Sequence, residues 1–289
     1  MPPLHSHHSA MADVGRVGAL DLRYHRDGSR TILTTSRCST PWHFFPPAYL
    51  DDSGCAVTSL VNPSGGFVAG DRLSIHAALE EGAHVLMTTP SANRIYRSLG
   101  EDSSQSVTLS VAPGAVLEWF PEVTIPFAGS RFVQTMTVSL AKGATALIWD
   151  SLASGRVARG ERWAFTSLCN EIDLTLASGG RLLERYHVRP EEAQGGVGWM
   201  SAYDYVASFF VVSEAMDPAR WPALRDTVAG ILDSFGGDLL GGVTEPPVPG
   251  LAVKLVSRSP EALAMGQELL WDATRREVLG LARPALRHY

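Results

Sequence analysis

Residues 73–90 read LSIHAALEEGAHVLMTTP: a strand of alternating polarity, a short turn that contains Gly82, and a second, more apolar strand. The same order of strand, glycine turn and strand recurs along the chain. The further copies are VTLSVAPGAVLEWFPE at 107–122, MTVSLAKGATALIWDS at 136–151 and IDLTLASGGRLLERYHV at 172–188. Units repeated about every 30 residues stack on one another, so this pattern predicts a mainly β, β-solenoid-like fold of stacked strands. A large sandwich of packed antiparallel hairpins is the alternative that the repeats leave open.

Helical periodicity arises only near the C-terminus. The segment 216–235, MDPARWPALRDTVAGILDSF, carries one apolar stripe and is followed by Gly236, a typical helix stop. A second helix should begin after the strand LAVKLVS, with Ser259 as N-cap and Pro260 at its first position. We expect these two α-helices to pack on the β body through their apolar stripes.

The composition of the chain limits the classes of protein to which it can belong. Residues 15–289 are expected to form a single domain, after a polar tail over 1–14 that contains His5, His7 and His8. The formal net charge of −6 gives no electrostatic reason to bind nucleic acid. Three widely spaced cysteines favour a reducing, cytoplasmic compartment. Neither a signal peptide nor an apolar run long enough to span a membrane is visible, so we expect no membrane partner.

The stretch GGFVAGDR, residues 65–72, has the glycine spacing of a phosphate-binding loop. Asp71 and Arg72 stand where that loop needs Lys and Ser or Thr, and the next residues alternate as a strand rather than a helix. A carboxylate would repel a phosphate. The glycines are therefore predicted to serve a bend or a close backbone approach at the entry to the first repeat.

Acidic residues inside apolar strands are the main candidates for function. Glu118 lies in VLEWF, Glu184 in RLLERY, Asp150 ends TALIWD, and Asp71 closes the glycine run. Glu118 and Glu184 stand four residues after their repeat glycines, which in a stack would place them on one face in different layers. Two explanations stay open, because buried carboxylates need partners: ion pairs with arginines, or a polar interior path that a divalent cation follows.

Other classes of function have weaker support. An enzyme would need a nucleophile beside a base, and the best set is Ser64 or Cys55 with His76, which no spacing favours. Trp221 and Trp271, in the two helical segments, are candidates for partner binding, because aromatic residues often anchor interfaces. A general protein-binding module and a metal-storage protein are the remaining alternatives.

A succession of motifs carries a resemblance to a known family. In order they are NPSGGFVAGD, GAHVLMTTPSANRIYRS, GAVLEWFPEVTIPF, SGRVARGERW and LLWDATRREVLGLARPALR. Together they resemble the urease accessory proteins UreD, also called UreH, over about residues 15–289.

The resemblance implies a β-rich stack with helices near the C-terminus and a non-catalytic maturation factor. Such a chaperone would bind the urease apoprotein and UreF and, through UreF, the GTPase UreG. It would hold no cofactor stably, and Ni²⁺ would be in transit. Asp71, Asp150 and Glu184, with Glu118 as a fourth, would then line an internal nickel path, because single carboxylates bind nickel weakly enough to release it.

Overall fold

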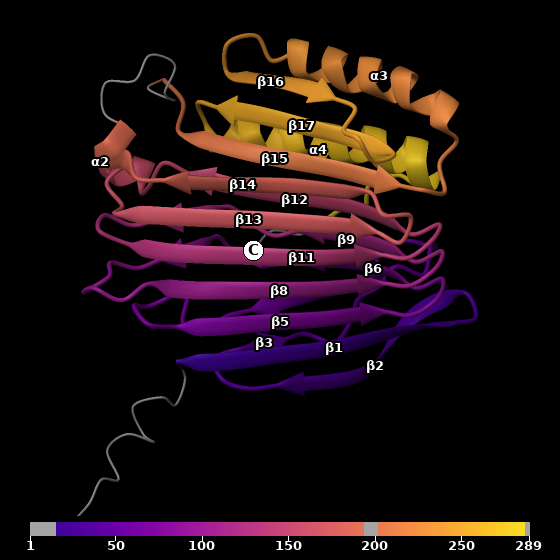
Figure 1. Ribbon diagram of the computed structural model, residues 1–289, viewed down its shortest axis with the longest axis horizontal. Coiled ribbons are helices and arrows are strands. Elements are labelled where there is room, and N and C mark those ends of the chain that lie inside the picture. The colour runs from indigo at the N-terminus through magenta and orange to yellow at the C-terminus, as the bar shows by residue number, and fades with distance from the viewer. Residues whose placement is uncertain (1–15, 194–201, 287–289) are drawn as a thin grey trace, which may run out of the picture.

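The computed structural model describes residues 16–193 and 202–286, and the predicted tail over 1–14 lies outside them. Two large sheets stack their strands side by side along one axis, and two helices lie at the C-terminal end of the stack (Figure 1). The prediction of a mainly β, solenoid-like stack with C-terminal helices is confirmed.

Seven of the described strands form the first sheet, in the order β14-β13-β11-β8-β5-β1-β2. Their bounds are β1 (Val17–Asp27), β2 (Arg30–Cys38), β5 (Arg72–Leu79), β8 (Ser103–Val111), β11 (Arg131–Leu140), β13 (Ser167–Leu176) and β14 (Arg181–Val188). The central neighbours β5, β8, β11 and β13 are parallel. One face of this sheet meets solvent, which is why β8 alternates between buried and exposed residues.

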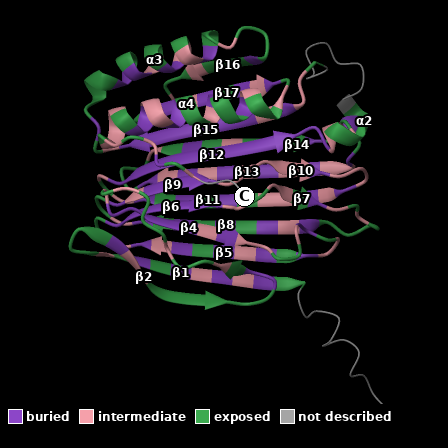
Figure 2. Ribbon diagram, turned by 180° about the vertical axis from the view of Figure 1, so that it is seen from behind, coloured by how far each residue is buried: buried purple, intermediate pink, exposed green. Residues whose placement is uncertain are grey.

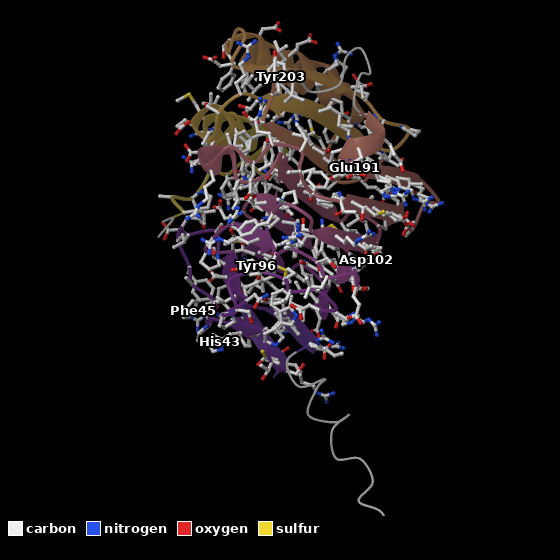
Figure 3. The ribbon with its side chains drawn as sticks, turned by 90° about the vertical axis from the view of Figure 1, so that its left-hand side faces the viewer. His43, Phe45, Tyr96, Asp102, Glu191 and Tyr203 are labelled. Atoms are coloured by element: carbon white, nitrogen blue, oxygen red, sulfur yellow. The ribbon has the colours of Figure 1, made fainter. Side chains whose placement is uncertain are left out.

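The second sheet runs behind the first, in the order β16-β17-β15-β12-β9-β6-β4-β3. Its strands are β3 (His43–Phe44), β4 (Ala56–Val61), β6 (His84–Thr88), β9 (Val116–Phe120), β12 (Thr145–Ala153), β15 (Tyr205–Ser213), β16 (Leu239–Thr244) and β17 (Gly250–Ser257). All nine residues of β12 are buried, because both faces of this sheet are covered. The short strands β7 (Asn93–Ile95) and β10 (Thr124–Pro126) form a third side of the stack. Figure 3 shows this side, with Tyr96 and Asp102 labelled.

Each coil runs from the first sheet to the second and returns by the short third side. The turns between the sheets hold Gly82, Gly114 and Gly143, whose φ values of 67°, 66° and 72° are in the left-handed region that glycine adopts without strain. Parallel pairing of β5 with β8, and of β6 with β9, keeps equivalent residues of successive coils in register. The regular glycine spacing in the sequence reflects this repeated corner.

The fourth predicted unit, residues 172–188, differs from the other three. Its two strands, β13 and β14, pair antiparallel within the first sheet instead of passing to the second. The left-handed residue of its turn is Gly179, with φ 93°, rather than Gly180. The expectation that Glu118 and Glu184 share one face is therefore wrong: Glu118 belongs to β9 of the second sheet and Glu184 to β14 of the first.

The two predicted helices are α3 (Trp221–Asp233) and α4 (Pro260–Leu279). Ser259 caps α4 by accepting a hydrogen bond from the Ala262 amide, and Gly280, with φ 69°, ends it. Both helices pack on the outer face of the second sheet (Figure 2). The remaining helical turns are η1 (Val157–Arg159), α2 (Pro190–Ala193) and η2 (Pro218–Arg220). Every described helix is too short or too polar to cross a lipid bilayer.

Two apolar clusters result from this arrangement. The larger fills the space between the sheets and includes Ile148 and Phe210. The other lies between the second sheet and the helices and includes Phe120, Trp149 and Leu270. Because successive residues of a strand face opposite sides, the second sheet contributes side chains to both clusters.

Candidate functional site

Asp150 lies in the middle of the interior between the two sheets. It occupies the same face of β12 as Ile148, and its carboxylate is surrounded by donors from the first sheet. Oδ1 accepts a hydrogen bond from Gln134 at 3.2 Å, and Oδ2 accepts from Asn170 at 2.9 Å and from the Tyr186 hydroxyl at 3.3 Å. Burial raises the pKa of Asp150, while the donors and the charge of Lys254 oppose that rise.

Three adjoining cavities share Asp150. The first, of about 70 Å³, reaches from Asp150 and Gln134 to Trp119 and the third side of the coils. A second, of about 10 Å³, is room for roughly one water among Gln134, Asp150, Asn170 and Tyr186. The third, of about 260 Å³, extends from Asp150 and Tyr186 to Glu184 and Lys254. The polar groups thus form one line through the interior.

Three of the five motifs that carry the resemblance meet at the first cavity. Its lining takes Gly65, Gly66 and Phe67 from NPSGGF, Thr89, Pro90 and Ser91 from TTPSAN, and Trp119, Pro121 and Glu122 from LEWFPE. These segments are far apart in the chain, and the coil brings their corresponding corners together. These three motifs therefore mark one end of the interior rather than three separate sites.

The glycine run contributes backbone to this cavity and holds no phosphate loop. β5, a strand, follows it. A Cβ on Gly66 would overlap the carbonyl oxygen of Arg94, and the same oxygen accepts a hydrogen bond from the Phe67 amide at 2.7 Å. The predicted close backbone approach is confirmed, since only glycine lets this loop pair beside β7.

Asp71 is buried at the start of β5 but does not line the three cavities. Its Oδ2 accepts a hydrogen bond from the Val68 amide at 2.8 Å, which closes the bend over residues 68–71. Burial raises its pKa, and the Val68 amide and Arg16 oppose this. The structure gives Asp71 a local structural role, and its place on a nickel path stays a prediction.

Glu118 faces away from the interior, toward helix α4. Its Oε1 accepts hydrogen bonds from His84 at 2.7 Å and from Arg275 at 3.0 Å, and its Oε2 accepts from the Trp271 indole at 2.6 Å. Burial would raise the pKa of Glu118, but His84 and Arg275 outweigh it and hold the pKa below its usual value. Ion pairing is therefore the explanation that fits Glu118, which lines none of the three cavities.

Ligand atoms of Cys55, His84 and Glu118 lie within 4.8 Å of one another. A metal ion here would face the Arg275 guanidinium, which already neutralises Glu118. Burial and the nearby Glu118 charge also raise the pKa of the Cys55 thiol well above its usual value, whereas a metal needs the thiolate. The group fits a structural role. Sequence reasoning missed it because its members stand singly in three separate strands or loops.

The described structure does not place the residues of the enzyme alternative close enough together to act as a nucleophile and a base. Cys55 is buried in the cluster beneath the helices, whereas His76 is exposed on β5 of the other sheet, and Ser64 is exposed in the glycine loop. The structure does not bring either nucleophile beside His76.

The two candidate partner-binding tryptophans are core residues. Trp221 is 4% and Trp271 is 3% exposed, and both belong to the cluster between the helices and the second sheet. The Trp271 ring stacks on Phe120 with centroids 4.4 Å apart. As placed, neither indole can anchor a partner, because the apolar stripe on which each lies is the one that docks its helix. The exposed large apolar residues of α4 are Met265 and Leu269.

The fold and the site define a class of protein: a stacked-β scaffold that encloses a line of polar groups between its sheets and carries two helices on its outer face. The model of the UreD urease accessory protein family matches residues 16–288. The chain belongs to the UreD family of urease accessory proteins, whose role is in urease maturation.

Two of the relatives match nearly the whole chain, and a third matches about three fifths of it. The chain is 39% identical over 282 residues to a urease accessory protein UreD of Delftia acidovorans, covering 92% of this chain and 89% of the relative. It is 33% identical over 281 residues to a UreD 2 of Streptomyces griseus, covering 94% of each. A UreD of Klebsiella aerogenes is 35% identical over 178 residues, 62% of this chain and 66% of the relative.

Proposed function

We propose that this chain is a non-catalytic scaffold that binds apo-urease and UreF, and through UreF the GTPase UreG, while Ni²⁺ passes through its interior to the urease active site. The observation that carries the proposal is the line of three cavities that share Asp150 in a member of a urease accessory family. Nickel is cargo here, held only in transit, in the reducing cytoplasm.

The chemistry of the interior suits a cation that must move on. Along the line, oxygen atoms of Gln134, Asp150, Asn170, Tyr186 and Glu184 follow one another. Carboxylate, amide and hydroxyl oxygens bind divalent transition metals more weakly than thiolates do, so the ion is not trapped. Cys169, on β13, is half-buried and lines none of the three cavities, and burial raises the pKa of its thiol.

Asp150→Asn and Glu184→Gln test the route. Each removes a charge while keeping size, so we expect nickel per active site and urease activity at limiting nickel to fall by about tenfold. Excess nickel should restore most of the loss, since the scaffold remains intact. The measurement is metal content and activity of urease co-expressed with its accessory proteins.

Asp102→Asn and Glu191→Gln, exposed acids labelled in Figure 3, are the matched controls and should load urease normally. If the interior variants load urease as the native chain does at every nickel concentration, nickel does not travel this way. A metal-storage function would appear instead as stoichiometric, tight nickel binding in equilibrium dialysis of the purified chain.

A further inference from the structure

The third cavity is the mouth of the interior, and the sheet topology explains why it opens there. The first sheet ends at β14, whereas the second continues beyond β12 through β15 and β17. In Figure 1, β15 and β17 lie beyond β14, the last strand of the first sheet, and Lys254 of β17 reaches Glu184 of β14 at this edge. Ser208 of β15 and Lys254 of β17 are in register with each other, and both line the cavity.

Lys254 bridges the mouth. Its ammonium forms an ion pair with the Glu184 carboxylate of β14 and donates a hydrogen bond to the Ser208 hydroxyl at 2.8 Å. It also lies 5.0 Å from the centroid of the Phe210 ring, within reach of a cation–π interaction. One positive charge thus stands where ligands from both sheets converge.

An ammonium group and a metal ion need similar ligands at this position. Both need oxygen atoms and negative charge, so Glu184 cannot serve a passing cation fully while Lys254 holds it. The Lys254 side chain is 48% exposed, and its flexible stem lets the ammonium swing into solvent. An arginine would hold Glu184 with a two-point fork that is harder to displace. Arginine is the usual cation of this chain, whose only two lysines are Lys142 and Lys254.

We propose that Lys254 is a tethered cation that occupies the metal position at the mouth, so that a divalent cation enters the interior only by displacing its ammonium from Glu184 and Ser208. This inference rests on the proposed route through Asp150. It assigns to Lys254 the control of entry, and it makes Glu184 and Ser208 the first oxygen ligands that an entering ion meets.

Lys254→Met tests this directly, because methionine keeps an apolar stem beside Phe210 and removes the charge. We expect Ni²⁺ to bind the purified full-length variant about tenfold more tightly than the native chain, equal to about 1.4 kcal/mol. Titration calorimetry with Ni²⁺ alone measures it. Lys142→Met, in the exposed turn between β11 and β12, should bind nickel as the native chain does. Adding Glu184→Gln to Lys254→Met should abolish the gain.

The same variants should be compared in urease loading at limiting nickel, where Lys254→Met should load faster than the native chain. Unchanged binding and loading in Lys254→Met, beside reduced loading in Asp150→Asn and Glu184→Gln, would remove the control of entry and leave the route standing. Normal loading in all three would remove the route itself. A folded Lys254→Met chain that loads more slowly would also overturn the inference, since the lysine would then assist entry.

Discussion

Replacing Glu118 with glutamine should lower the free energy of unfolding by about 3–5 kcal/mol. The carboxylate is completely buried, and its three polar neighbours, His84, Trp271 and Arg275, all donate hydrogen bonds to it. An amide would direct its own N–H groups at donors. Among the described residues, it would leave the buried Arg275 with only Asp51, 3.1 Å away, as a charged partner. Because Trp271 and Arg275 both belong to α4, the change should loosen this helix first.

Urea unfolding followed by circular dichroism measures the loss. Glu101→Gln is the matched control, since Glu101 is exposed and its change should stay within about 0.5 kcal/mol. The double variant Glu118→Gln with Arg275→Met should lose less than Glu118→Gln alone, because no unpaired cation remains. A loss below about 1 kcal/mol in the single variant would show that the ion network contributes little to stability.

Lowering the pH should reduce the difference in free energy of unfolding between the native chain and the Glu118→Gln variant. The pKa of Glu118 is held below its usual value in the folded chain. Its contribution to stability is therefore complete above the unfolded carboxyl pKa of about 4.3 and disappears as pH falls through the folded pKa. The glutamine variant has no such group to protonate.

The repeat pattern predicts the stack because each corner needs the same local conformation. Gly82, Gly114 and Gly143 mark three turns in which left-handed backbone recurs, and the caps at Ser259 and Gly280 bound α4 in the same local way. These features depend on a few adjacent residues. They are therefore readable from a single sequence.

The direction of the acidic side chains could not be read in this way. Alternation separates the two faces of a strand, but it does not say which face meets the other sheet and which meets a helix. The second sheet is covered on both sides, so its strands are apolar throughout and the usual polarity signal disappears. Asp150 and Glu118 consequently look alike in sequence, although one lies in the interior and the other under α4. Lys254 gave only a weak signal, a single charge in LAVKLVS, because its partners come from β14 and β15.

Trp271→Ala should also cost about 3–5 kcal/mol of unfolding free energy. The indole is 3% exposed, stacks on Phe120 and donates a hydrogen bond to Glu118. Alanine would therefore leave a cavity and deprive a buried carboxylate of one hydrogen-bond donor. Trp271→Phe keeps most of the packing and loses the hydrogen bond. It should cost about 1.5–3 kcal/mol, as expected for a hydrogen bond to a charged group.

Substitutions on the outward face of α4 should, in contrast, leave the stability of the chain almost unchanged. Met265 and Leu269 stand one turn apart and are 58% and 43% exposed, so Met265→Ser with Leu269→Ser should change stability by no more than about 0.5 kcal/mol. If the partner contact expected on the C-terminal helices is a contact of α4 with UreF, this double variant should lose UreF in a pull-down while it melts like the native chain. Retained UreF would place the contact elsewhere. Loss of UreF in Trp271→Ala alone is no evidence for a contact, because unfolding of α4 would produce it too.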